Sequence, residues 1–335
     1  MASIKDVAEA AGVSTATVSR VFSNKPHVRA AVRERVMAAV EQLAYRPNRA
    51  ARTLRSQQSN TIGLIVSDIR NSFFTAISRA VEDTAYAHGY SVLLCNTDED
   101  PEKEELYLKL MQDENVAGII FSPTRQIIAR FADMEIAFPI VLVDRSLKNG
   151  DVDAVLLDNV RAAYELTKHL LDQGYRQIGL LLGAVGTTGQ ERQRGYEDAL
   201  REYGCVPRAE LIRDVQPQVD AGRVATLALL ALAQPPDAIF ASNNLLTAGA
   251  LQAIRERGLR IPHDLALAGF DETTWATLVE PAVTVMEQPT DDIGRTATEL
   301  LLQRIAAPNR PIRKVILQGQ LRARGSSARR ESLIP

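Results

Sequence analysis

The chain has 335 residues, of which 46% are hydrophobic and 24% charged, and its formal net charge is −2. This length exceeds one ordinary small domain, and this balance is typical of a folded soluble protein. The chain starts without an apolar run after a basic segment, and no stretch approaches the roughly 20 apolar residues of a membrane helix. We therefore expect no secretion signal, no membrane association and a cytoplasmic location. The distant Cys95 and Cys205 are expected to be buried free thiols, not a disulfide or metal site.

The basic residues gather at the N-terminal end. Residues 1–60 contain ten Lys and Arg and four acidic residues, a charge of +6 that leaves −8 for the rest of the chain. A basic head on an acidic body indicates a polyanionic partner at one end only. On charge alone, a surface of dispersed charge remains the alternative.

The first predicted element is a short helix over residues 4–11, where apolar residues recur at spacings of three and four. Gly12 interrupts the pattern as a turn residue, and Ser14 is a suitable N-cap for a second helix over 15–22. A third helix is expected over about 30–44, with an apolar stripe that closes a small core. Two short helices joined by a tight turn with glycine are typical of a helix-turn-helix motif.

In a helix-turn-helix motif, the N-terminal residues of the second helix reach base edges in the major groove of DNA. Arg20 can donate two hydrogen bonds to guanine, whereas Thr15 and Ala16 offer a hydroxyl and methyl groups. One such motif reads few base pairs, so we expect a homodimer on a pseudopalindromic, double-stranded operator. The residues of the head that we expect at the DNA are Ser14, Thr15, Ala16, Thr17, Arg20 and Asn24.

The sequence of the head, IKDVAEAAGVSTATVSRVFSNKP over residues 4–26, resembles that of the LacI/GalR family of bacterial repressors at nearly every position that defines the family. The resemblance covers helix, turn, cap and recognition helix together, and a generic three-helix module is the alternative. It implies a DNA-binding transcriptional regulator, in practice a repressor, and not an enzyme.

A hinge is expected over residues 47–60. Pro47 ends the third helix, and the helical segment that follows is too short to be stable alone in water. In the LacI/GalR family this segment folds in the minor groove of the operator, with the Leu of an ARxL pattern wedged between base pairs. Residues 51–54 match that pattern, so the resemblance implies that Leu54 bends the duplex. A flexible basic linker is the alternative. The DNA-binding residues expected here are Arg49, Ala51, Leu54 and Arg55.

From residue 61 onward, short aliphatic runs alternate with helical patterns, such as those over 73–88 and 101–114. Aliphatic runs between helices imply parallel sheets covered on both faces. About ten strands exceed one doubly wound unit, so we expect two α/β lobes. The strand-like runs are TIGLIVS, YSVLLCNT, VAGIIFS, PIVLVD, AVLLD, QIGLLLG, AIFAS and LALAGFD.

The order of these runs, with the landmarks ASNN, PHDLALAGFDET and VTVMEQP, resembles the type I periplasmic-binding-protein fold that forms the body of LacI/GalR repressors. The resemblance implies that the chain crosses between the lobes three times, near 158–159, 287–289 and 319–322. The expected domains are a helix-turn-helix domain at 1–46, a hinge helix and linker at 47–60, and an effector-binding domain at 61–335, with lobe one at about 61–158 and 290–319 and lobe two at about 159–289 and 320–330.

Polar residues follow several of the predicted strands, and ligands of parallel sheets lie beyond the carboxyl ends of the strands. Carboxylates and amides suit sugar hydroxyls, Phe73 can stack on a sugar face, and Arg192 can bind a carboxylate or a vicinal diol. By similarity to the family, several of these positions line the effector site; for each alone, a helix cap or surface loop is the alternative. The expected effector-binding residues are Phe73, Ser122, Asp144, Thr188, Arg192, Asn243 and Asp271.

Two departures from the family bear on the effector. Asn244 stands where family members usually have Asp, and no aromatic residue stands at 216–218. Both favour a polar or anionic effector over an apolar nucleobase, and Arg125 and Arg145 can add positive charge. We expect a sugar or a sugar acid such as 2-ketogluconate or gluconate, whose binding changes operator affinity. A purine or another metabolite is the alternative.

Other classes of protein fit the sequence poorly. The four histidines are scattered without metal-ligand spacing, so we expect no catalytic residue, metal or cofactor. Gly183, Gly186 and Gly189 form GxxGxxG, which differs from the dinucleotide-binding GxGxxG pattern. A sugar-binding transport protein would share the body but lack residues 1–60. The end of the chain shows no heptad repeat, so we expect no tetramer-forming coiled coil.

Overall fold

The computed structural model describes residues 2–22, 28–45, 59–131, 134, 136–147, 152–183 and 186–328. The chain divides into two compact units, Met1–Ser59 and Asn60–Pro335. Within the described ranges, no helix is both long and apolar enough to span a membrane. The same residues contain no group of three or more His, Cys, Asp or Glu side chains arranged to hold a metal ion.

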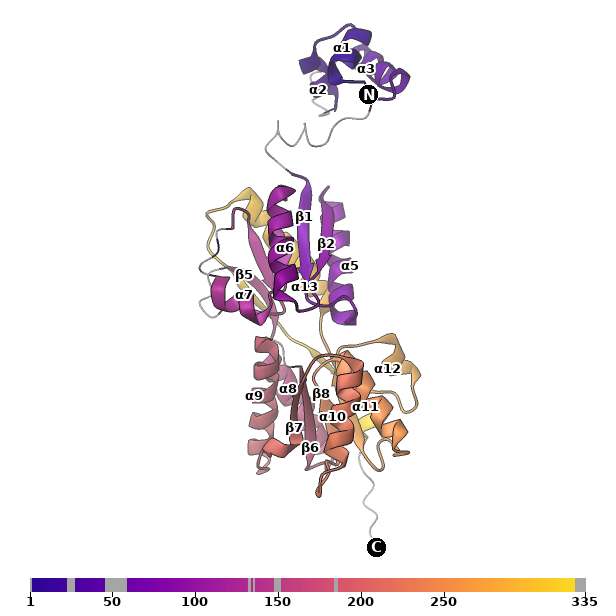
Figure 1. Cartoon of the computed structure of the whole chain (residues 1–335), viewed down its shortest axis with the longest axis vertical. Coiled ribbons are helices and arrows are strands. Elements are labelled where there is room, and N and C mark those ends of the chain that lie inside the picture. The colour runs from indigo at the N-terminus through magenta and orange to yellow at the C-terminus, as the bar shows by residue number, and fades with distance from the viewer. Residues whose placement is uncertain are drawn as a thin grey trace. The chain divides into compact units, whose positions relative to one another are not determined.

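The N-terminal unit contains three helices, α1 (Ile4–Ala10), α2 (Thr15–Phe22) and α3 (Ala30–Gln42) (Figure 1). A capping box between Ser3 and Asp6 starts α1. Gly12 adopts a φ of +61° in the turn between α1 and α2, where a side chain would be strained. The three helices pack through a small core whose buried residues are Val7, Ala8, Ala11, Val18, Val21, Val36 and Ala39. The predicted three-helix head is confirmed, with α3 ending two residues before its expected end.

The C-terminal unit contains two six-stranded sheets, one in each lobe (Figure 1). Lobe one has the strand order β11-β5-β4-β3-β1-β2, and lobe two has the order β12-β10-β9-β8-β6-β7. Neighbouring strands in the described ranges pair in parallel, except β10 and β12. The strands of lobe one are β1 (Thr61–Val66), β2 (Ser91–Asn96), β3 (Ile119–Phe121), β4 (Ile140–Val143), β5 (Asp153–Leu157) and β11 (Lys314–Leu317). The strands of lobe two are β6 (Ile178–Gly183), β7 (Ile212–Val215), β8 (Ala238–Ala241), β9 (Ala266–Phe270), β10 (Thr284–Glu287) and β12 (Gln320–Arg322).

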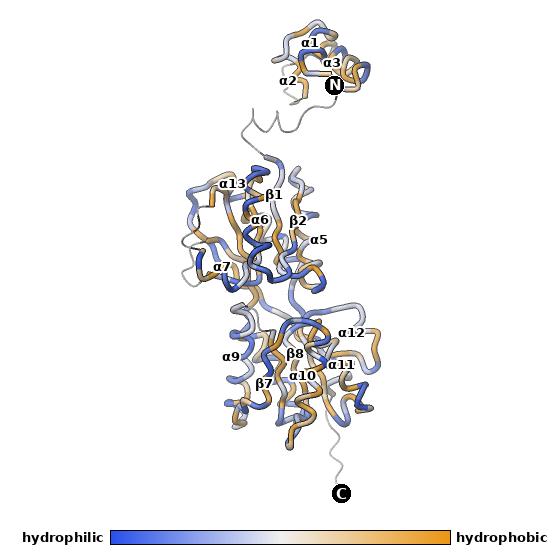
Figure 2. Tube along the Cα trace, in the orientation of Figure 1, coloured by the Kyte–Doolittle hydropathy of each residue, from blue (hydrophilic) through white to orange (hydrophobic). Residues whose placement is uncertain are grey.

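Helices cover both faces of each sheet, so successive strand residues enter different cores. In β8, for example, Phe240 belongs to the core under α8 and α9, whereas Ile239 belongs to the core under α10 and α11. Figure 2 shows the resulting hydrophobic strands between helices with hydrophilic stretches. The helices of lobe one are α5 (Ser72–Ala87), α6 (Pro101–Asp113), α7 (Arg125–Arg130) and α13 (Thr290–Ala306). Those of lobe two are α8 (Asn159–Asp172), α9 (Thr187–Glu202), α10 (Val219–Leu230), α11 (Asn244–Glu256) and α12 (Thr274–Leu278), with short 3-10 helices at Ala209–Leu211 and Gly325–Ser327.

The chain passes from one sheet to the other three times, between β5 and α8, between β10 and α13, and between β11 and β12. The predicted fold class, a helical head with a two-lobed, doubly wound α/β body, is confirmed. The carboxyl ends of most strands of both sheets therefore meet where the lobes adjoin, which is the place where such folds bind ligands.

Both cysteines are free thiols, as expected, but only one of them is buried. Cys95 in β2 is buried, whereas Cys205 is partly exposed. Burial raises the pKa of the Cys95 thiol, so this group stays protonated and unreactive at neutral pH.

Candidate functional site

A polar cavity lies between the two lobes, at the carboxyl ends of their strands. Six of the seven residues expected at the effector line it: Phe73, Asp144, Thr188, Arg192, Asn243 and Asp271. Other lining residues include Asp68, Asn71, Phe74, Glu99, Arg145, Pro217, Ser242 and Gln288. The structure thus brings residues that follow eight different strands to one place.

Ser122, the seventh expected residue, is not among the residues that line the cavity. Its side chain is fully buried at the end of β3, where its hydroxyl lies 3.0 Å from the Ser67 hydroxyl at the end of β1. The prediction for Ser122 therefore needs correction, because the hydroxyl joins two neighbouring strand ends instead of facing the cavity.

Arg192 on α9 is the central cation of the cavity. Its guanidinium carbon lies 4.0 Å from the centroid of the Phe270 ring, within cation–π range. Nε donates to Asn159 Oδ1 at 2.9 Å, and Nη1 donates to the carbonyl oxygen of Ser242. Burial lowers the pKa of Arg192, but an arginine remains protonated in proteins. Arg192 Nη2 donates to no described residue, so its two N–H groups are available to a ligand.

Carboxylates from both lobes accompany this cation. Asp144 follows β4 and Asp271 follows β9, and both adopt left-handed backbone conformations, with φ of 65° and 71°. Such values are uncommon for residues other than glycine and are best tolerated by Asp and Asn. Burial raises the pKa of both carboxyl groups, while the charge of Arg192 favours their ionised forms. Asp271 also accepts hydrogen bonds from the backbone of Asn244 and from Gln288.

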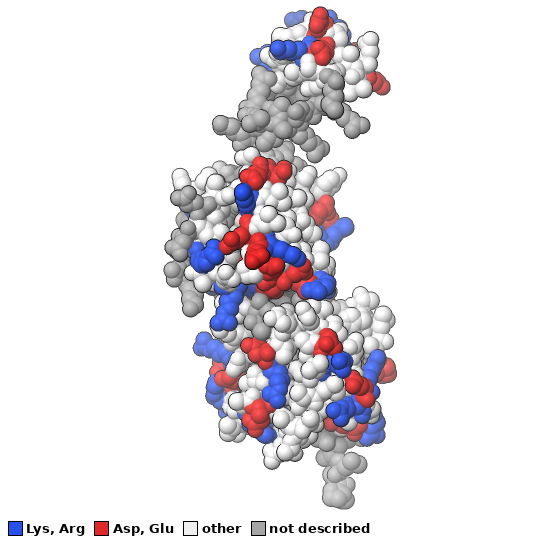
Figure 3. All heavy atoms as spheres, in the orientation of Figure 1, with Lys and Arg blue, Asp and Glu red and all other residues white. Residues whose placement is uncertain are grey.

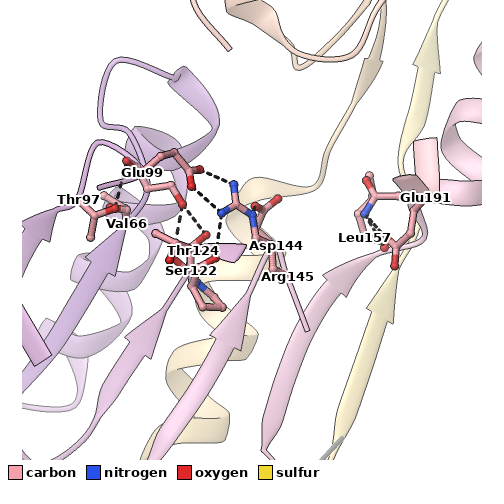
Figure 4. A network of polar contacts seen from close by, with 12 residues as sticks. Val66, Thr97, Glu99, Ser122, Thr124, Asp144, Arg145, Leu157 and Glu191 are labelled. Carbon is pink, nitrogen blue, oxygen red and sulfur yellow. Dashed lines mark hydrogen bonds and ion pairs between the residues drawn. The ribbon is translucent and has the colours of Figure 1, made fainter. Parts of the chain in front are cut away.

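Arg145 lines the cavity, but its charge is already matched (Figure 4). Nη1 and Nη2 donate to the two oxygens of Glu99 at 2.9 and 2.5 Å, a bidentate pair. Nε lies 3.2 Å from Asp144 Oδ2. The positive charge expected from Arg145 is thus balanced within the wall. Arg125 is exposed at the start of α7 and does not line the cavity.

The lobes also touch directly beside the cavity. Asn244 at the start of α11 donates through Nδ2 to Asn71 Oδ1 at 2.8 Å and to Ser72 Oγ at 2.5 Å. Asn71 caps α5 in lobe one, and Asn243 caps α11 in lobe two. The departure at Asn244 that the sequence pointed out therefore supplies a neutral hydrogen-bond donor between the lobes.

Both hydrogen-bond donors and hydrogen-bond acceptors line the cavity. Asp68 is bound by Arg70, and Glu99 is bound by Arg145, so these four charges compensate in pairs. Arg192 Nη2 and the amide N–H groups of Asn71 and Asn243 donate to no described residue, and the carboxylates of Asp144 and Asp271 can accept further hydrogen bonds. The arrangement suits a small molecule with several hydroxyl groups.

In the head, the second helix presents polar residues away from the core. Val18 and Val21 are buried, Arg20 is exposed, and Thr15 and Ala16 are partly exposed. Ser14 acts as the predicted cap, since its Oγ accepts from the backbone N–H of Thr17 at 3.2 Å and lies 3.0 Å from the Thr17 hydroxyl. The other predicted DNA-binding residues, Asn24, Arg49, Ala51, Leu54 and Arg55, lie outside the described residues.

Comparison with known proteins places these two units in one family. Residues 3–48 match the model of the lacI family of bacterial regulatory proteins, and residues 59–325 match the model of periplasmic binding proteins and the sugar-binding domain of the LacI family. Together the two matches cover nearly the whole described chain.

Individual relatives support the same family assignment. The ribose operon repressor of Halalkalibacterium halodurans is 37% identical over 306 residues, which cover 91% of each chain. The HTH-type transcriptional regulator PtxS of Pseudomonas aeruginosa is 37% identical over 328 residues, covering 97% of this chain and 95% of the relative. The lac repressor dimer bound to operator and an anti-inducer is 27% identical, with a TM-score of 0.84 over 98% of this chain and 99% of that one. These relatives are transcription regulators and not enzymes. The chain therefore belongs to the LacI family of DNA-binding transcriptional regulators.

Proposed function

We propose that this regulator changes its affinity for operator DNA when a small polar effector occupies the cavity between its lobes. The observation that carries the proposal is the buried Arg192, which has unused N–H groups and stands with the carboxylates of Asp144 and Asp271 from opposite lobes. A ligand that contacts both lobes stabilises one arrangement of them over others, which is the requirement for coupling to a second site.

For the effector itself we propose a sugar acid, with 2-ketogluconate and gluconate as specific candidates. Arg192 can pair with a carboxylate, and the N-termini of α5, α9 and α11, which favour negative charge, contribute lining residues. Phe73 offers a flat apolar surface, and Asp144, Asn243 and Asp271 offer partners for hydroxyl groups.

A neutral sugar is the second candidate, because Asp144 and Asp271 can both accept from hydroxyl groups. The name of the ribose operon repressor among the relatives favours this alternative. A purine is the third candidate; the cavity offers Phe73 and Phe74 for stacking but is otherwise strongly polar.

A thermal-shift panel followed by calorimetry tests these candidates. The panel contains 2-keto-D-gluconate, D-gluconate, D-glucose, D-ribose, guanine and hypoxanthine. A ligand that binds only the folded state raises the melting temperature through mass action. We expect the two acids to stabilise the protein most. If only a neutral sugar stabilises the protein, the neutral-sugar hypothesis replaces the sugar-acid hypothesis. If only a purine does, both sugar hypotheses are contradicted.

We propose that the DNA-bound form is a homodimer in the cytoplasm that reads a pseudopalindrome. Strand β2 forms one edge of its sheet, and exposed apolar side chains, among them Leu94 in β2 and Tyr86 in α5, suit contact with a second copy.

The expected DNA-reading residues stay as proposed: Arg20→Ala should weaken binding to the selected operator far more than to random DNA, and Leu54→Ala should reduce DNA bending in a circular-permutation gel assay. Equal loss on both DNAs, or an unchanged bend, would remove these roles.

A further inference from the structure

Glu104 on α6 is a carboxyl group buried behind the wall of the cavity, and it is not among the residues that line the cavity. Its side chain is fully inaccessible to solvent. Oε1 accepts from the backbone N–H of Thr124 at 2.7 Å, and Oε2 accepts from the Thr124 hydroxyl. No Lys or Arg of the described chain forms an ion pair with it. Burying a carboxyl group without an ion pair costs free energy of folding, so Glu104 is a candidate for a functional role.

One peptide group joins Glu104 to the cavity wall. The Thr124 N–H that donates to Glu104 belongs to the same peptide group as the carbonyl oxygen of Pro123. That carbonyl oxygen accepts from Arg145 Nη1 at 2.9 Å. Figure 4 shows Thr124, Arg145 and Glu99 in this network at the ends of the strands. Hydrogen bonds in such a series polarise one another, so a charge on Glu104 strengthens the bond that Arg145 makes at the other end.

Arg145 occupies a place where its position matters to both lobes. It follows β4 in lobe one and lines the cavity. Gly186, the N-cap of α9 in lobe two, approaches it so closely that a Cβ atom there would lie 2.6 Å from Arg145 Nε. Nε itself is buried and makes no hydrogen bond. Among the described residues, the polar partners of the guanidinium all belong to lobe one: Glu99, Asp144 and the Pro123 carbonyl.

The surroundings of Glu104 allow its charge to vary near neutral pH. Burial raises the pKa of Glu104 to about 7, opposed by the hydrogen bonds from Thr124, while the charge of Glu99 raises it and that of Arg145 lowers it. Figure 3 shows further acidic side chains over α6. The other charged groups on the neighbouring elements are engaged or exposed: Lys103 binds Asp98, Arg130 binds Glu105, Asp144 contacts Arg145, Asp100 caps α6, and Arg125 is exposed.

We propose that Glu104 is a positioning residue of the effector cavity: through the Pro123–Thr124 peptide group it fixes the Arg145 guanidinium in the wall, and it does so more strongly when ionised than when protonated. An ionised acceptor makes the stronger hydrogen bond, and the peptide group passes the polarisation on. The importance of Arg145 for the effector rests on the proposed function, whereas the coupling between Glu104 and Arg145 does not.

A double-mutant cycle in the full-length chain tests the coupling. Glu104→Gln, Arg145→Gln and the double variant are compared with the native chain by urea unfolding near pH 6 and near pH 8, on either side of the Glu104 pKa. Near pH 8 the midpoint of the double variant should differ from the sum of the single shifts. Near pH 6, where Glu104 is mostly protonated, that difference should fall to less than half. A purely structural cap on Thr124 would give no such change with pH.

Glu105→Gln is the matched control, because Glu105 is the exposed neighbour on α6 and binds Arg130. Its shift should add to that of Arg145→Gln at both pH values. Additive shifts for Glu104 and Arg145 at both pH values would overturn the proposal. The cycle needs no ligand, so this outcome stays distinct from a failure of the effector panel, which would count against the proposed function alone.

A second measurement covers the case in which Glu104→Gln does not fold. In protein labelled with ¹³C at the glutamate side-chain carboxyl, the Glu104 resonance, assigned by its loss in Glu104→Asp, reports its titration directly. In Glu99→Gln the titration midpoint should move to lower pH, because the like charge is removed and the Arg145 charge is no longer compensated. An unchanged midpoint would contradict the link.

Discussion

Arg192 illustrates how a single residue acquires its role from its contacts. Its guanidinium is held against the Phe270 ring and by two hydrogen bonds, so the remaining N–H groups have a fixed direction. A rigid fork loses little entropy on binding and matches a carboxylate or a diol with two parallel bonds. A lysine at this place would keep the charge but lose the fork and the stacking.

Arg192→Lys should therefore weaken effector binding while leaving effector-free operator binding near its native level. We expect a loss of about 2 kcal/mol or more, roughly thirtyfold in Kd, which is the usual scale for a desolvated charged contact. Calorimetry with the compound that stabilises the native chain measures it. Arg194→Lys, exposed on the same helix, is the control and should bind normally. Native affinity in Arg192→Lys would move the site away from this residue.

Asp153 at the start of β5 forms a buried ion-pair cluster in lobe one. Its side chain is fully buried, Arg304 and Arg310 bind it at 3.0 and 3.3 Å, and the backbone N–H of Arg313 donates to it. Burial alone would raise the pKa of Asp153, but these hydrogen bonds and charges outweigh it and lower the pKa below the usual 3.8. Removing the charge leaves two largely buried arginines uncompensated.

We expect Asp153→Asn to lower the free energy of unfolding by about 3 kcal/mol near neutral pH. Because the folded pKa is lowered, the contribution of Asp153 is present above the unfolded pKa and is lost as pH falls through the folded pKa. The difference between native and variant should thus shrink below about pH 4 in urea-unfolding curves. Asp198→Asn, in an exposed pair with Arg201, should change stability by less than about 0.5 kcal/mol. A constant difference across this pH range would rule out the ionised pair.

At the scale of elements, most central strands and the edge strand β2 were predictable as apolar runs, whereas the edge strands β7, β11 and β12 were not. β1, β3, β4, β6, β8 and β9 read as aliphatic runs because both faces of each are buried. β7 (IRDV) and β11 (KVIL) lie at sheet edges with alternating or partial exposure, so their residues carry no such signal. β12 has three residues and pairs antiparallel with β10, which depends on a lobe crossing that local patterns do not encode.

The candidate site shows the same division. Asp144, Asn243 and Asp271 were found because each directly follows a recognisable strand. Glu99 was not, because it stands in an acidic run that resembles a solvated surface, and only the fold turns it toward Arg145. Ser122 also follows a strand, but the register of β3 against β1 points its hydroxyl at Ser67. Position along the chain locates a strand end, whereas the direction of the side chain needs the neighbouring strand.

Two helix pairs of lobe two pack at glycine contacts that leave no room for a methyl group. A Cβ atom at Gly195 of α9 would lie 2.0 Å from the carbonyl oxygen of Val160 in α8. Alanine would favour the isolated helix by about 1 kcal/mol, but the contact is with backbone that cannot rotate away.

Gly195→Ala should thus destabilise lobe two by about 2 kcal/mol or more, measured by thermal unfolding followed by circular dichroism. Gln190→Ala, on the exposed side of α9, provides the comparison and should be neutral or slightly stabilising. A more stable Gly195→Ala protein would mean that α8 and α9 are further apart than the structure has them.

At the scale of the whole effector-binding body, the structure joins the lobes through polar contacts as well as through three chain crossings. Asn244 alone makes two of these contacts, and both acceptors lie at the N-terminus of α5. These contacts involve only residues of the protein, so they favour the arrangement of the lobes in which they form. A closed form that is already populated lowers the free energy that the effector must supply to hold it.

Asn244→Ala removes both donors and should shift the effector-free body toward open lobes. Small-angle scattering of the full-length protein should then show a larger radius of gyration than the native chain without ligand, and a saturating effector should restore the native value. The effector should also bind more weakly, since part of its binding energy now closes the lobes. Gln252→Ala, exposed on the same helix, should scatter as the native chain does. If Asn244→Ala scatters like the native protein without effector, then the three crossings alone hold the lobes, and the coupling between cavity and DNA must start from contacts made by the ligand itself.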